Sequence, residues 1–180
     1  RAVVADILAR QALTLEHKLA RTLLVLEIGR TDYEYLHDDI ERLLKTTPYM
    51  QDTSFANPQI ILALCNYANA LPFVNTSLHT TIKVKAREFL SNNGRAKEAF
   101  NTTHRAFAAN WHLQAAAAAC RLLDLSVTPS HVSFLDEAIE LCETAVANAR
   151  LESSGSFIEG DPTNTSLTEQ ACATHGLLAV

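Results

Sequence analysis

Apolar residues recur at steps of three and four along most of the chain, which is the pattern of one face of an α-helix. Residues 2–28 give a clear example, with apolar side chains at Val3, Val4, Ile7, Leu8, Leu15, Leu19, Leu23 and Leu26. Gly29 then favours a helix end, and Thr31 with Glu34 forms a capping box that begins a second helix, over residues 31–45. The alternation typical of a strand never persists. The pattern therefore predicts an all-α fold.

Proline, glycine and asparagine divide the middle of the chain. Asn57-Pro58 is typical of an N-cap followed by a first helical residue, and it predicts a helix over residues 58–71 that Pro72 ends. The next predicted helix covers residues 77–91. It stops at Asn92-Asn93-Gly94, since both residue types tolerate the left-handed backbone of a helix end.

The second half of the chain continues in the same way. Residues 95–125 keep the helical pattern, and polar Asn101-Thr102-Thr103 divides them into a short and a long helix. Thr128-Pro129 predicts the start of another helix that extends to about residue 151. After a turn-rich stretch, Ser166 begins the last helix with a second capping box.

Short connections between these helices favour antiparallel neighbours. We therefore expect about seven helices in antiparallel hairpins, arranged as a helical solenoid, a bundle or a partial α/α toroid. The 180 residues fit one domain, 1–180. The chain begins at Arg1 without a methionine and stops inside an apolar run, so we also expect a fragment of a longer chain.

Charge and composition narrow the range of possible functions. A net charge of −5 argues against nucleic-acid binding, which usually needs a basic face. No stretch reaches the ~20 apolar residues of a membrane span, so we expect a soluble protein. Its compartment stays open, with secreted and periplasmic locations among the options, and so does its oligomeric state.

Motifs for metals and cofactors are missing from the sequence. None of the four cysteines (Cys65, Cys120, Cys142 and Cys172) belongs to a CxxC pair, and no HExxH or phosphate-binding loop occurs. We therefore expect no metal and no cofactor. Because the cysteines lie among apolar neighbours, we expect buried thiols, with disulfides between helices as the alternative in a secreted protein.

Two resemblances concern the second half. Residues 111–151 resemble a tetratricopeptide-type helix pair, although no second copy follows at a 34-residue period. Residues 104–180 resemble the end of the helical toroid in alginate-lyase-type polysaccharide lyases. The elements that carry this likeness are a polar turn with His, a long helix, Phe134-Leu135-Asp136-Glu137-Ala138, and Ser154-Gly155-Ser156-Phe157-Ile158-Glu159.

The lyase resemblance implies β-elimination on a uronate polymer, with the Gly-Ser-Phe loop against an acidic sugar. The chain departs from the catalytic motif, because no Tyr follows Glu159 and the expected Arg is missing. The candidate catalytic residues under this resemblance are Asn101, His104, Asn110, His112 and Glu159.

Trp111, the single tryptophan, and Phe157 are the candidate binding residues. Trp111 stands between an amide and an imidazole and could line a polar pocket, or it could pack as a wedge at the start of an alanine-rich helix. The favoured function is a non-catalytic helical scaffold that presents a surface to a protein or an extended ligand. The alternatives are a polysaccharide lyase and a structural subunit of an assembly.

Overall fold

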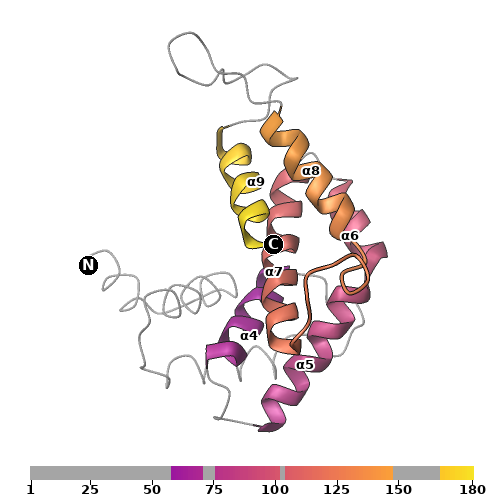
Figure 1. Cartoon of the computed structure of the whole chain (residues 1–180), viewed down its shortest axis with the longest axis vertical. Helices are drawn as coiled ribbons and strands as arrows, with labels where there is room; N and C mark the ends of the chain where they lie inside the picture. The colour runs from indigo at the N-terminus through magenta and orange to yellow at the C-terminus, as the bar shows by residue number, and fades with distance from the viewer. Residues whose placement is uncertain (1–57, 71–75, 102–103, 148–166) are drawn as a thin grey trace, which may run out of the picture.

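The computed structural model describes residues 58–70, 76–101, 104–147 and 167–180 (Figure 1). The described residues are all-α, as predicted, and contain no strand. Their six helices are α4 Pro58–Ala70, α5 Thr76–Ser91, α6 Asn93–Phe100, α7 Arg105–Leu123, α8 Leu135–Ala147 and α9 Leu167–Ala179. None of these helices combines the length and the apolarity that crossing a bilayer requires. The two helices predicted before residue 46 lie outside the described residues.

Helix α7 is the centre of the described fold. It packs against α4, α5, α8 and α9 and also contacts the short α6 (Figure 1). Its middle is the alanine run of residues 115–119, all of them buried. Because the side chain of alanine is a single methyl group, several helices can pack close to the backbone of α7 at once.

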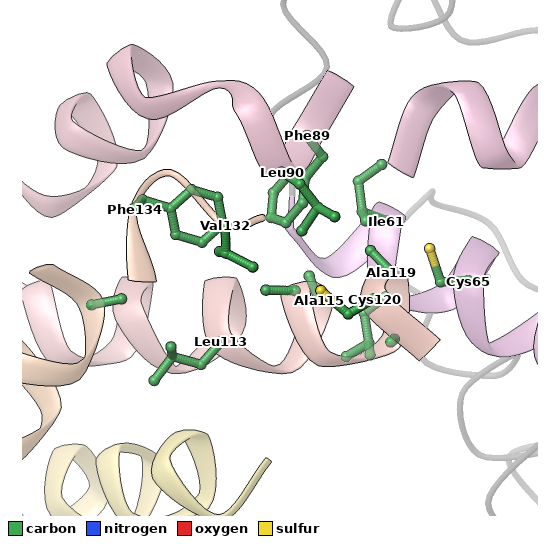
Figure 2. Close-up of a cluster of buried hydrophobic side chains, with 14 of the residues drawn as sticks. Ile61, Cys65, Phe89, Leu90, Leu113, Ala115, Ala119, Cys120, Val132 and Phe134 are labelled. Atoms are coloured by element: carbon green, nitrogen blue, oxygen red, sulfur yellow. The ribbon is translucent and has the colours of Figure 1, made fainter. Parts of the chain in front are cut away.

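The core forms where α4, α5 and α7 meet the segment before α8. Figure 2 shows the side chains that converge there, each of them at most 3% exposed: Ile61, Phe89, Leu90, Leu113, Val132 and Phe134. Since α4 is apolar on nearly every face, eight of its residues are buried as well.

The end of α5 at Ser91 confirms the predicted helix over residues 77–91, but the geometry of this boundary differs from the prediction. Asn92 donates its backbone N–H to the carbonyl of Phe89, and its side-chain oxygen accepts the N–H of Arg95 at 3.3 Å. Asn92 is therefore the N-cap of α6, and Gly94 lies in the first turn of that helix. The predicted left-handed end at Asn92-Asn93-Gly94 is wrong. Among the described non-glycine residues only Asp124, at the end of α7, has a positive φ, of 56°.

The start of α8 also differs from the prediction. Thr128-Pro129 predicts the start of this helix, whereas α8 begins at Leu135. The carbonyl of Thr128 accepts the N–H groups of His131 and Val132, both at 2.9 Å, in a turn that does not continue as a helix.

A contact with α5 explains why that turn is not extended into a helix. The backbone N–H and the hydroxyl of Ser133 both donate to the carbonyl of Leu90, at 3.0 and 2.9 Å. This anchor holds the segment against the end of α5. Val132 and Phe134, on either side of Ser133, are buried in the core. The long-range contact therefore overrides the local helix signal.

Candidate functional site

His112 lies in the core of the protein, although it was predicted as a catalytic candidate. It is 2% exposed and is surrounded by three phenyl rings. The centroid of its ring lies 5.7 Å from that of Phe89 in a stacked arrangement, and 5.0 and 5.4 Å from those of Phe100 and Phe134 in edge-on arrangements. We call these four residues the aromatic cluster.

The imidazole of His112 is neutral in this environment. Burial lowers its pKa below the usual 6.5, and the hydrogen bond to the backbone of Ala108 opposes that effect only in part. Because a carbonyl can only accept, Nδ1 carries the proton that is donated to the oxygen of Ala108 at 2.8 Å. The Nδ1–H group of His112 thus forms its hydrogen bond within its own helix.

We expect the stability of the protein to fall as the pH drops below 6.5. Above this value the ring of His112 is neutral in both the folded and the unfolded chain, so it contributes no pH dependence. Below it the unfolded chain binds a proton that the folded core excludes, which lowers the free energy of unfolding by up to about 1.4 kcal/mol per pH unit. Urea denaturation at pH 7.5 and 5.5 measures this loss. The His112→Leu variant should lose less stability over the same interval, and an equal loss in both proteins would contradict the assignment.

Asn110 is also buried, and it lies where α7 meets α9. Its side-chain oxygen accepts a hydrogen bond from the side-chain amide of Gln114 at 2.8 Å. Gly176 of α9 packs directly on it, since a Cβ added to Gly176 would lie 2.8 Å from the Cα of Asn110. In this arrangement Asn110 contributes to the packing of α7 against α9.

The other two described candidates lie at the surface, in the connection between α6 and α7. Asn101 is the exposed C-cap of α6 and donates its backbone N–H to the carbonyl of Lys97. His104 is the exposed N-cap of α7, and its carbonyl accepts the N–H of Ala108. The described catalytic candidates therefore divide into an exposed pair before α7 and a buried pair within it. Glu159 and Phe157 lie outside the described residues.

Two aromatic side chains one helical turn apart mark the surface of α7. Phe107 is 37% exposed, and its ring meets that of the half-buried Trp111 edge-on at a centroid distance of 6.2 Å. The indole Nε1 of Trp111 is buried and has no hydrogen-bond acceptor among the described residues. We call Phe107 and Trp111 the surface aromatic pair. Sequence reasoning identified Trp111 from its neighbours but missed Phe107, whose signal would have been its i, i+4 spacing from the tryptophan.

The described ranges contain no group of three His, Cys, Asp or Glu side chains that could hold a metal ion. All four cysteines lie in described helices, and none of them forms a disulfide there. Cys65, Cys120 and Cys142 are buried, whereas Cys172 is partly exposed.

No family model, no curated protein and no solved structure matches the chain, so comparison with known proteins assigns it neither a family nor a function.

Proposed function

We propose that this chain is a helical scaffold that binds a protein or an extended ligand at the start of α7, through the surface aromatic pair. The observation that carries the proposal is the exposed apolar area of Phe107, whose ring meets that of the half-buried Trp111 edge-on at the surface of α7.

The physical argument rests on how aromatic residues bind. Tryptophan and phenylalanine offer a large contact area with few rotatable bonds, and tryptophan is enriched among residues that dominate binding energy. Asn110 and His112, by contrast, are engaged in packing within the core.

The single tryptophan makes the proposal directly testable, because all indole fluorescence comes from Trp111. Peptides selected from a displayed library on the intact protein serve as protein-like probes, and polymannuronate and polygalacturonate oligosaccharides serve as extended probes. We expect at least one probe class to shift the emission of Trp111. The Phe107→Ala variant should weaken that binding roughly tenfold to thirtyfold.

Val84→Ala is the matched control, because Val84 is 43% exposed but lies on α5. Equal weakening by Phe107→Ala and Val84→Ala, or no response of Trp111 to any probe, would contradict the proposed surface. The absorbance of an unsaturated uronate product measures its release from either polymer. Such a release would show that the protein catalyses β-elimination rather than binding alone. In that case Asn101→Ala and His104→Ala are the first variants to assay.

A further inference from the structure

The first turns of α7 leave one side of the helix accessible to a partner. His104, Arg105 and Phe107 are exposed, and Ala108 and Trp111 are half-buried, whereas the other residues of 104–113 are buried. Successive residues of an α-helix lie about 100° apart, so the accessible positions cover about 160° of its circumference. Around the helix their order is Phe107, Trp111, His104, Ala108 and Arg105. We call these five residues the exposed arc.

The two edges of the exposed arc border different helices. Asn110 follows Phe107 around the helix and packs on α9. At the other edge His112 lies beside Arg105 and contacts α6, with a centroid distance of 5.0 Å to the ring of Phe100. Figure 1 accordingly shows α9 and α6 on opposite sides of α7. The aromatic edge of the arc therefore lies towards α9, and the basic edge lies towards α6.

Helix α6 adds positive charge beside the basic edge. Residues 93–123, which include α6 and α7, contain four Lys and Arg residues and one acid, Glu98, although the whole chain has a net charge of −5. Lys97 of α6 and Arg105 of α7 are both exposed. This part of the surface therefore attracts carboxylates.

Helix α8 carries the opposite charge on another side of α7. Residues 124–147, which include α8, contain five acids and no Lys or Arg. The Sγ of Cys142 on α8 lies 4.0 Å from the carbonyl oxygen of Ala106, a buried residue on the side of α7 away from the exposed arc. An acidic partner is therefore repelled by α8 and attracted to the arc, which favours one orientation of binding.

We infer that the partner of the surface aromatic pair is an acidic segment of another protein, which lies across the exposed arc. An apolar side chain of this segment packs on Phe107 and Trp111, and a carboxylate meets Arg105 and Lys97. The inference rests on the proposed function, because it names the partner of the same surface.

The separation of the two edges favours a peptide over a polyuronate. An α-helix with its side chains is about 10–12 Å across, and side chains four residues apart in an extended peptide lie on one face about 13 Å apart. An apolar residue and an Asp or Glu at this spacing reach both edges. A polyuronate carries a carboxylate on every sugar and would place charge against the aromatic edge, where its desolvation is unfavourable.

Selection of binders from a displayed library of random peptides, with the intact protein as target, tests the inference. We expect the selected peptides to be enriched in Asp or Glu near an aliphatic or aromatic residue. A selected peptide without tryptophan is then compared with its counterpart that has Asn and Gln in place of Asp and Glu, by the fluorescence of Trp111. The carboxylate peptide should bind roughly threefold to tenfold more tightly, and high salt should reduce this difference.

Arg105→Gln removes the charge at the basic edge. It should weaken binding of the carboxylate peptide roughly threefold to tenfold and leave binding of the amide peptide unchanged. Arg121→Gln is the matched control, because Arg121 is exposed in the last turn of the same helix. It lies about 24 Å along the helix from Arg105, beyond the screening length of about 10 Å at 0.1 M salt. This variant should bind both peptides as the unmodified protein does.

The possible outcomes separate this inference from the proposed function. Selected peptides without a preference for carboxylates, or equal effects of Arg105→Gln and Arg121→Gln, would overturn the acidic partner but leave the surface aromatic pair as a binding site. Tighter binding of polymannuronate than of every selected peptide would overturn the choice of a peptide. If no probe changes the emission of Trp111, the proposed function itself is wrong and this inference fails with it.

Discussion

Replacement of Phe134 by alanine is expected to lower the free energy of unfolding by about 3–5 kcal/mol. Phe134 is 1% exposed and meets Phe89, Phe100 and His112 edge-on, so its removal empties the middle of the aromatic cluster. The neighbouring rings belong to helices that are anchored elsewhere and cannot fully collapse into the space. Urea denaturation followed by circular dichroism measures the change.

Phe107→Ala is the matched control for that experiment. The same atoms are removed, but Phe107 is partly exposed and its aromatic contact is the one with Trp111. Its loss should therefore lower the free energy of unfolding by no more than about 1.5 kcal/mol. Similar losses for the two variants would mean that Phe134 is not in the core.

Gly176→Ala should destabilise the protein by about 1–3 kcal/mol, and Gly176→Val by more. In an open helix the substitution of glycine by alanine is favourable by about 1 kcal/mol. Here the new Cβ would lie 2.8 Å from the Cα of Asn110, a backbone atom that cannot rotate away. Either α9 must move away from α7 or the backbone must shift, and both options weaken the packing between the two helices.

Gly94→Ala separates this contact from helix propensity. Gly94 lies in the first turn of α6, and a Cβ added there would meet no atom within 4 Å. We expect this variant to stabilise the protein by about 0.5–1 kcal/mol. If α9 packs closely on α7, thermal melts should show a lower melting temperature for Gly176→Ala and a higher one for Gly94→Ala. A stabilising Gly176→Ala would show that the approach is looser than described.

Local signals in the sequence are sufficient to predict part of the fold. The predicted helix over residues 58–71 agrees with α4, Pro58–Ala70, because the signals that predict it, Asn57-Pro58 and Pro72, are local in the sequence. The division of residues 95–125 into two helices is confirmed by α6 and α7 for the same reason. The start of α8 could not be found in this way, because it depends on Ser133 and Leu90, which are 43 residues apart in the chain.

The candidate site was harder to predict than the helices. Helix α7 is buried on most of its faces, so its pattern of apolar and polar residues does not tell an inward position from an outward one. The lyase resemblance makes His112 and Asn110 catalytic candidates, whereas their burial follows from the partners that surround α7. Gly176 does carry a signal in the sequence, because a glycine inside a helical pattern indicates a packing role.

The central position of α7 determines how the domain can open. The four larger described helices all pack on it, so a fluctuation that frees its middle must disrupt several interfaces at once. Backbone amides in the alanine run should therefore exchange with solvent only through global unfolding. The eight-residue α6 has the smallest interface with α7 among the described helices, so its detachment would be the subglobal opening of lowest free energy.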